Sequence, residues 1–420
     1  MTLATHPDPF LLDATAADVQ GDARRLAARG PLVEAVLSDV GLRVWATGNR
    51  AVAEHILGDR DAFVKDPKHW ADLTEGKVPG NWGIAEFITM PGMLNADGAE
   101  HRKLRQLVSG AFTARRVEDL RPRIDEIVRE LIADLAQAAP HGFIELRRRF
   151  AFELPMQIIC ELFGLDPGSG EALTRNYTAM HASSSTVEEA TAGKQGVVAI
   201  IAALIKEKRR SPADDLTSAL IAATDGEDAT LDDGLLLYTL MLFLFAGQST
   251  TQDLIVNCLK ALADHPSQLA RVRAGAVPIE DVVEEVLRWQ SPINTIMFRY
   301  AARDVVVPGT NVIVKKGEAV VICVAATGRD EQSFGPDAHA FDPGRGVLAR
   351  HLSFGWGVHV CMGAPLARMM TATAVGAIVE AFDLDRSGAP EPAPISSFSP
   401  NSFVELWMGL TARTTASAVA

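Results

Sequence analysis

The sequence predicts a mainly α-helical protein with a smaller β-rich lobe, and three observations support this fold class. Residues 113–138 repeat apolar side chains at helical spacing, with an interruption at Pro122. Residues 235–246 are almost continuously apolar, which is typical of a helix buried in a core. Short alternating runs separated by Pro-Gly and Lys-Gly turns predict strands, which we place at 305–307, 312–314 and 319–324.

The chain is expected to form a single domain, 1–420, with two lobes. Its 420 residues are 48% hydrophobic and 22% charged, an ordinary globular composition that is sufficient for a large core. We expect the helix-rich lobe at about 97–290 and 345–380, and the β-rich lobe at about 30–60, 293–325 and 380–412.

Charge and cysteine content favour a soluble, cytoplasmic protein. A net charge of −13 argues against nucleic acid as a partner. Residues 1–20 contain no basic region followed by an apolar run, so neither a signal peptide nor an anchor is expected, and the 235–246 run is too short for a membrane span. Four scattered cysteines suit a reducing compartment: Cys160, Cys258, Cys323 and Cys361.

The remaining elements follow from periodicity and turn signals. In chain order we expect a helix at 18–30, a hairpin at 33–45, a helix beginning at Asn49, a long aromatic-rich loop at 66–92, a buried helix at 150–165, two weaker helices at 168–211 joined near 183–186, and a hairpin at 395–410. Asp97 is a suitable cap for a helix on which His101 and Arg105 share one face.

The helix expected at 230–263 contains Ala246-Gly-Gln-Ser-Thr-Thr251 and should break there. Glycine in a helix interior costs about 0.5–1 kcal/mol. Hydroxyl groups also compete for backbone carbonyls and distort a helix locally. A distorted turn with inward hydroxyls would make a polar niche.

The glycine-rich loop of residues 352–368 presents Cys361 at the start of a helix, where the dipole and free amides favour a thiolate. Such a thiolate could be a nucleophile, a zinc ligand or an axial iron ligand. The absence of a CxxC pair argues against zinc. A nucleophile needs a general base, and His359 in an extended loop can point elsewhere. A buried structural cysteine is the simplest alternative.

The order Phe354-Gly-x-Gly-x-His359-x-Cys361-x-Gly363 resembles the haem-binding loop of cytochrome P450 enzymes. The resemblance implies the cytochrome P450 fold, with haem b as cofactor and Cys361 as the axial iron ligand. It implies four residues that hold the haem propionates, His101, Arg105, Arg299 and His359. The other expected cofactor contacts are Ala246, Phe354 and Gly363.

By the same resemblance, Thr250 is the oxygen-activating threonine of the central helix, with Gly247 and Ser249 beside it. The family usually has Asp or Glu where this chain has Ser249. Neither Ser249 nor the preceding Gln248 can supply a proton by ionising, so a proton relay must run through Ser249, Thr250, water or a substrate group.

Two further sets of residues follow from the resemblance. Glu285 and Arg288 match the Glu-x-x-Arg brace under the haem, and because Ala340 stands where an arginine is usual, His339 or Arg345 is expected to substitute. The expected substrate pocket contains Trp82, Ile293, Asn294, Thr295, Met297 and Asn401.

The leading hypothesis is a monomeric, bacterial-type haem-thiolate monooxygenase that uses O₂ to oxidise a small-to-medium hydrophobic molecule, in specialised-metabolite biosynthesis. Electrons from NAD(P)H are expected through ferredoxin and ferredoxin reductase, because no flavin or iron–sulfur segment is fused. A basic docking patch should contain Arg102, Lys103, Arg115, Arg116, Arg350 and Arg368. The alternatives are oxidative C–C or C–N coupling without oxygen insertion, a non-catalytic haem or metabolite-binding protein, and, most remotely, a zinc or thiol enzyme.

Overall fold

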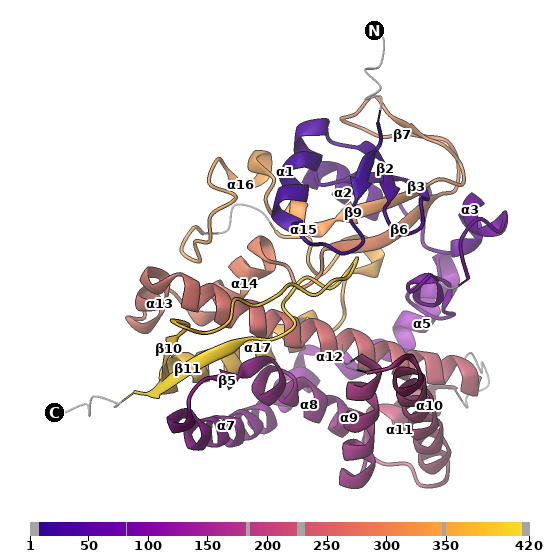
Figure 1. Cartoon of the computed structure of the whole chain (residues 1–420). Coiled ribbons are helices and arrows are strands. Elements are labelled where there is room, and N and C mark those ends of the chain that lie inside the picture. Colours follow the sequence, from indigo (N-terminus) through magenta and orange to yellow (C-terminus); the bar gives the residue numbers. More distant parts are fainter. Residues whose placement is uncertain (1–7, 81, 182–184, 225–231, 347–349, 414–420) are drawn as a thin grey trace.

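The computed structural model describes residues 8–80, 82–181, 185–224, 232–346 and 350–413 (Figure 1). The α-helices are α1 (Val19–Arg29), α2 (Arg50–Gly58), α3 (Ala71–Thr74), α4 (Ala85–Thr89), α5 (Gly98–Ser109), α6 (Ala114–Asp119), α7 (Arg121–Ala138), α8 (Glu153–Phe163), α9 (Pro167–His181), α10 (Val187–Arg210), α11 (Leu216–Thr224), α12 (Asp233–Asp264), α13 (Pro266–Arg273), α14 (Ile279–Trp289), α15 (Val324–Thr327), α16 (Glu331–Phe334) and α17 (Ala364–Ala381). Short 3-10 turns are η1 (Pro67–His69), η2 (Gly110–Phe112), η3 (Ala139–His141) and η5 (Gly357–His359), and η4 (Arg147–Ala151) is a π-helical turn.

The strands are β1 (Phe10–Leu12), β2 (Val33–Leu37), β3 (Arg43–Thr47), β4 (Phe63–Val64), β5 (Ile144–Glu145), β6 (Thr295–Ala301), β7 (Val305–Val306), β8 (Ile313–Val314), β9 (Ala319–Cys323), β10 (Phe382–Asp385) and β11 (Trp407–Ala412). A six-stranded sheet has the order β1-β2-β3-β9-β6-β4, and smaller sheets are β10-β11-β5 and β7-β8. The predicted hairpin at 33–45 is confirmed, because β2 and β3 pair antiparallel.

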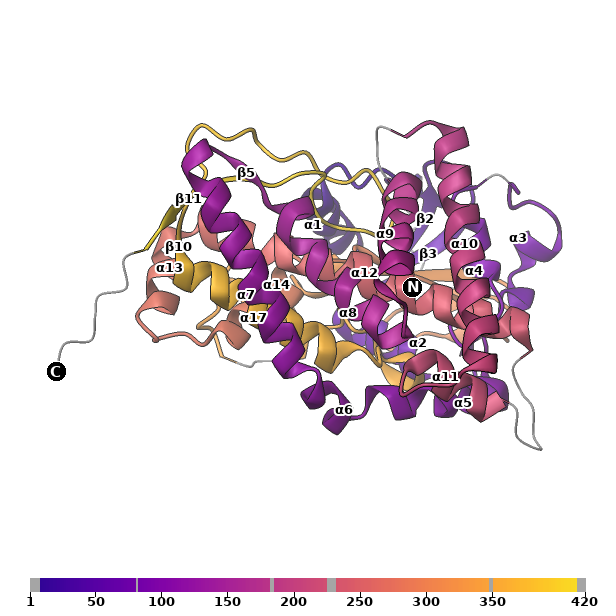
Figure 2. The same ribbon diagram turned by 90° about the horizontal axis from the view of Figure 1, so that it is seen from below.

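The mainly α-helical fold class is confirmed. Helix α12 crosses the middle of the molecule, with α8 to α11 on one side of it and the six-stranded sheet on the other (Figure 1). Seen from below, α7 runs beside α17, and α9 lies beside α10 (Figure 2). The junction near 183–186 falls partly on residues 182–184, which lie outside the described chain.

The C-terminal strands form a sheet of their own with β5, apart from the six-stranded sheet. Buried residues of β5, β10 and β11 share one apolar cluster with α7, α14 and α17. Strand β11 pairs with β5, which follows α7 and η3 in the chain. The 395–410 hairpin is shorter than expected: Pro394 pairs with Phe403, whereas Trp407 and Met408 pair with β5 and Gly409–Ala412 pair with β10.

Helix α12 is continuous over 32 residues, so the expected break at 246–251 is wrong. Ser249 and Thr250 direct their hydroxyls to the carbonyls four residues earlier, and the helical ladder is kept. In length and hydropathy α12 would suffice to cross a membrane. Its buried Asp253 and Asn257, however, pack against other elements, as expected for a core helix.

Candidate functional site

Two glycines shape the loop that carries Cys361. Gly355 and Gly357 have φ of +76° and +72°, a region that side chains with a Cβ rarely adopt. A Cβ on Gly357 would lie 2.6 Å from the carbonyl oxygen of Leu57 in α2. The loop then closes through a 2.8 Å hydrogen bond from the Cys361 amide to the carbonyl of Phe354. Backbone geometry therefore sets the position of Cys361 just before α17.

The sulfur of Cys361 lies among groups that favour a thiolate. Burial raises the pKa of this thiol, while the amides of Gly363 and Ala364 and the cations Arg105 and Arg368 lower it. The other three cysteines are at least partly buried, and burial raises their pKa values, to about 11 for Cys160. Cys361 alone of the four is exposed as a residue, but its sulfur is buried, and burial outweighs the neighbouring amides and cations, so the pKa of the free thiol is raised on balance. A metal cation bound there would keep the sulfur deprotonated.

His101 and His359, which the resemblance places among the propionate-holding residues, lie side by side. Their ring centroids are 4.1 Å apart, and the Nε2 atom of each is buried without a hydrogen-bond partner. His359 Nε2 lies 3.9 Å from Asp97 Oδ1. Burial lowers both histidine pKa values, that of His359 to about 4. At neutral pH each ring is uncharged and has one N–H to donate.

Arg299 and Arg105 add positive charge on the same side. Arg299 is 3% exposed, and burial lowers its pKa to about 10, which still leaves it cationic at neutral pH. It follows a bulge in β6, where Phe298 has a φ of +38°. Arg105 donates to the Val360 carbonyl at 2.7 Å. Arg299 acts electrostatically on both His101 and His359.

These residues fit haem. His101 Nε2 is buried without a hydrogen-bond partner, and His359 Nε2 has only the Asp97 carboxylate at 3.9 Å. Arg105 and Arg299 form no ion pair with a described carboxylate, and Arg105 acts electrostatically on the Cys361 thiol. Two propionates would supply the acceptors and the negative charge, and iron would bind the sulfur. Ala246 is exposed although its neighbours Leu244 and Gln248 on α12 are buried, so a flat group could face the helix there. Phe354 lies beneath Arg368, whose guanidinium carbon is 4.5 Å from the ring centroid.

The expected oxygen niche is only partly as anticipated. Thr250 Oγ1 donates to the Ala246 carbonyl at 2.6 Å, and Ser249 Oγ donates to the Phe245 carbonyl at 2.9 Å. Gly247 instead faces α8, where an added Cβ would lie 3.2 Å from Ile159. Its lack of a side chain therefore serves helix packing.

The Glu285–Arg288 brace has Arg345 as its third member. Arg288 and Glu285 form a bidentate pair with both distances 2.7 Å, and both side chains are 4% exposed. Arg345 Nε donates to Glu285 Oε1 at 3.0 Å. His339, the other expected substitute, provides its carbonyl to Trp289 and Arg329, and its ring lies 3.6 Å from Glu331 and not at the brace.

The basic patch is smaller than expected. Arg102, Lys103, Arg115, Arg116 and Arg350 are exposed. Arg368 is instead paired with Glu284 at 2.5 Å. Glu284 also contacts His351, and, although burial opposes it, these partners lower the pKa of Glu284 to about 2.

Several expected substrate contacts serve the framework. Trp82 is buried against Trp70 and Phe298, and its Nε1 donates to Asp39 at 2.7 Å. Thr295 is 2% exposed and donates to the Phe398 carbonyl. Both polar groups are therefore already bonded. Backbone atoms tie the other positions together: Asn294 N donates to the Ser399 carbonyl, and Ile293 pairs with Pro400, whereas Met297 is partly buried.

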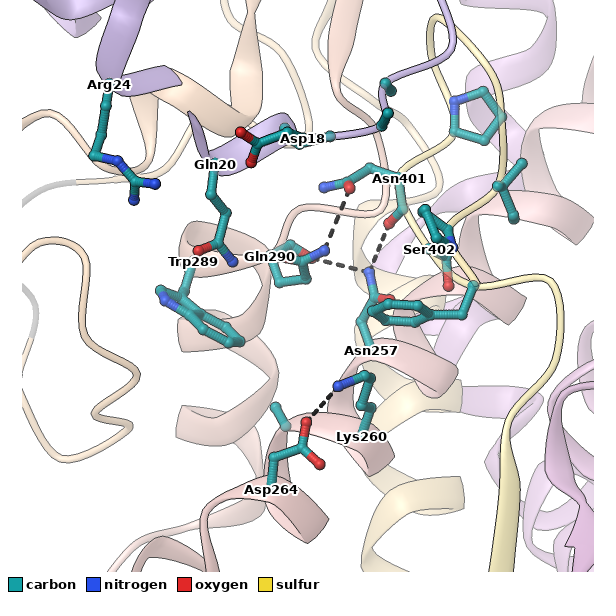
Figure 3. Close-up of a pocket in the computed structure, with 18 residues that line it drawn as sticks. Asp18, Gln20, Arg24, Asn257, Lys260, Asp264, Trp289, Gln290, Asn401 and Ser402 are labelled. Carbon is teal, nitrogen blue, oxygen red and sulfur yellow. Dashed lines mark hydrogen bonds and ion pairs between the residues drawn. The ribbon is translucent and has the colours of Figure 1, made fainter. Parts of the chain in front are cut away.

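Asn401 lines a different pocket, of about 390 Å³ (Figure 3). Asn401 bonds there to Asn257 and Gln290, and Lys260 pairs with Asp264. No residue of the cysteine loop, of α5 or of the 246–251 stretch lines this pocket. The Asn401 carbonyl accepts from Asn257 of α12 and its side-chain oxygen accepts from Gln290, which follows α14, so this residue links the 394–403 segment to both helices.

Residues missed by the sequence reasoning are buried ions. Arg147 and Asp253 pair at 2.6 Å, with Asp253 2% exposed. Asp97 occupies the cap position of α5 but does not cap it; its carboxylate accepts from the amides of Lys65 and Asp66. Lys65 is itself buried. Only an apolar context around charged residues could have indicated them.

Residues 279–404 match the family profile Cytochrome P450. The chain is 36% identical over 377 residues to 2-hydroxy-5-methyl-1-naphthoate 7-hydroxylase of Streptomyces carzinostaticus, covering 89% of this chain and 90% of that protein. It is 36% identical over 365 residues to cytochrome P450 monooxygenase PikC of Streptomyces venezuelae, covering 87% and 84%. The solved structure of CYP154C4 from Streptomyces sp. W2061 has a TM-score of 0.88 and 36% identity, covering 96% of this chain and 98% of that one.

Proposed function

The chain belongs to the cytochrome P450 family, and from this premise we propose that Cys361 is the axial thiolate ligand of a bound haem b. The family and its relatives make the protein a haem monooxygenase of the hydroxylating type, with a place in specialised-metabolite biosynthesis. The observation that carries the proposal is the position of the Cys361 sulfur, near the amides of Gly363 and Ala364 and beside buried, partly unpartnered His101 and His359.

Haem with a thiolate ligand, when bound, activates dioxygen for attack on unactivated C–H bonds. The chain supplies binding and orientation. His101 and His359 can each donate one N–H to a propionate, and Arg105 and Arg299 contribute positive charge. Charge-assisted hydrogen bonds of this kind are worth about 1.5–3 kcal/mol each.

Thr250 and Ser249 position water and cannot release a proton by ionising. Each hydroxyl gives its hydrogen to a carbonyl of α12. The Ser249 hydroxyl also interacts with Tyr177, whereas the Thr250 oxygen can still accept a hydrogen bond from water. A proton must then reach the site along water or from a group on the substrate. We propose Thr250 Oγ1 as the atom that holds this water.

The substrate is proposed to be a small-to-medium hydrophobic molecule of specialised metabolism, because one relative is named as a hydroxylase of a substituted naphthoate. Electrons are proposed to come from NAD(P)H through a ferredoxin and its reductase. The exposed Arg102, Lys103, Arg115 and Arg116 are the proposed docking surface, and the protein is proposed to act as a monomer in the cytoplasm. Neutralising Arg102 and Lys103 should slow reduction most at low salt; equal rates at low and high salt would contradict the docking surface.

The haem proposal is tested with purified protein and carbon monoxide. The reduced adduct should show the red-shifted band of thiolate-ligated haem, and Cys361→His should lose that band while retaining haem. A globin-like band in the unaltered protein would refute the assignment. Product mass under ¹⁸O₂ then separates the reactions: incorporated label supports hydroxylation, and loss of two hydrogens without label supports coupling. A haem protein that turns over no substrate with competent reductants would support the non-catalytic alternative.

A further inference from the structure

Lys65, which follows strand β4, is a buried cation beside the proposed propionate site. Its residue is 5% exposed. Its Nζ donates to the Met297 carbonyl at 2.7 Å, and it forms no ion pair with any described residue. Its backbone amide donates to both carboxylate oxygens of Asp97, at 3.0 and 2.8 Å. An ammonium has three hydrogens to donate, and one of them is accounted for here.

A buried ammonium without a counter-charge is costly, so its presence needs an explanation. Burial lowers the pKa of Lys65 well below its ordinary value, and Arg299 lowers it further, while Asp97 raises it. Asp97 carries one negative charge and cannot neutralise both Lys65 and Arg299. A negatively charged group from outside the protein would neutralise the second cation.

The charges around the site support this reading. Lys65 and Arg299 are both buried, and neither forms an ion pair with a described residue. Asp97 is the one carboxylate that acts on Lys65, Arg299, His101 and His359. The two buried side chains share this single carboxylate, so a negatively charged group from outside the protein would complete their neutralisation.

Lys65 also holds the backbone that presents Arg299. The register of β6 shifts between Ile296 and Arg299, and Phe298 has a positive φ that is unfavourable for a bulky residue. The Met297 carbonyl, which accepts from Lys65, directly precedes Phe298. The lysine therefore stabilises the strained turn from which the Arg299 side chain departs.

We propose that Lys65 is a positioning residue for the haem propionates: it fixes the Met297–Phe298 bulge that carries Arg299, and it adds positive charge beside the two carboxylates. This inference rests on the proposed haem site. It adds a cation that lies more than 30 residues before His101 and outside every motif used to find the site.

The test compares Lys65→Met and Lys65→Gln with Lys68→Met as the matched control. Methionine keeps the length of the side chain but removes both charge and donor, whereas glutamine keeps a donor for the Met297 carbonyl. Lys68 is exposed and pairs with Asp66. Each holoenzyme is assayed for haem transfer to apomyoglobin and for its reduction potential.

Lys65→Met should release haem at least tenfold faster. It should also lower the reduction potential by about 59 mV, which is a tenfold shift of the one-electron equilibrium toward the oxidised form, because a nearby positive charge favours the reduced state. Lys65→Gln should show the same potential shift with a smaller change in release. Lys68→Met should match the unaltered protein within twofold.

A Lys65→Gln protein with unaltered potential would overturn the charge role, and this variant decides the matter if Lys65→Met does not fold. Unaltered haem release in Lys65→Met would overturn the positioning role. Failure of the haem site itself is recognised separately, because the unaltered protein would then lack the thiolate band before any Lys65 variant is made.

Discussion

Removal of Arg288 should destabilise the protein more than any other single change in the brace. Its guanidinium makes two 2.7 Å bonds to Glu285 and further bonds to the carbonyls of Gly328, Ala338 and Ala340, at 2.6, 2.7 and 2.9 Å. Breaking a buried ion pair by removing one partner costs about 3–5 kcal/mol. Buried acceptors that lose their donor add about 1–3 kcal/mol each.

The sum for Arg288→Ala approaches the whole stability of a typical domain, which is about 5–15 kcal/mol. Arg345→Ala is the matched comparison. Glu285 then keeps Arg288 and the Asp342 amide, so the loss should be close to one charge-assisted hydrogen bond, about 1.5–3 kcal/mol.

The assay is urea unfolding followed by tryptophan fluorescence, together with the yield of soluble protein. Arg345→Ala should fold with a lowered midpoint, and Arg288→Ala should give little or no folded protein. If the two midpoints coincide, the carbonyl contacts of Arg288 contribute nothing measurable and the reasoning is refuted.

Three further outcomes are expected. Arg147→Ala should lower the free energy of unfolding by about 3–5 kcal/mol, because Asp253 would stay buried without its partner; a loss below 1 kcal/mol in urea would contradict this. The pKa of Glu284 is lowered from 4.5 to about 2, so its contribution to stability is complete above pH 4.5 and disappears as the pH falls toward 2. Glu284→Gln should therefore flatten the pH dependence of the thermal midpoint between pH 4.5 and pH 2. An unchanged slope in this variant would contradict the prediction. Gly357→Ala should abolish haem incorporation, because the added Cβ would lie 2.6 Å from a backbone oxygen. In Gly355→Ala the nearest contact of the added Cβ would be 3.7 Å, so this variant should cost only the strain of its positive φ, about 1–2 kcal/mol. Equal haem content in the two variants would refute the steric argument.

The site was largely predictable where its residues are close in sequence. The glycines, His359 and Cys361 lie within one loop, and Glu285 and Arg288 are one helical turn apart, so short local motifs were enough to carry the family resemblance that identified them. Their mutual contacts depend on turn geometry and helical periodicity, which the local sequence encodes.

Features that depend on contacts between distant segments could not be predicted. Lys65 and Met297 are brought together by the pairing of β4 with β6, and Arg147 contacts Asp253 only after η4 packs on α12. The prediction of a break in α12 was wrong for a different reason, because a hydroxyl group can bond to a carbonyl of its own helix without ending the helix. No feature of the local sequence distinguishes a glycine that is needed for helix packing, such as Gly247, from a glycine that lines an oxygen-binding niche.

The contact between Gly357 and Leu57 has a consequence for biosynthesis. It joins segments about 300 residues apart, so the cysteine-bearing loop has no partner to close against until the first sixty residues have adopted their native arrangement. Closure over such a span is entropically slow. Because Gly357 and Cys361 are synthesised late, the loop can close against Leu57, and the proposed haem site can form, only after nearly the whole polypeptide has been made.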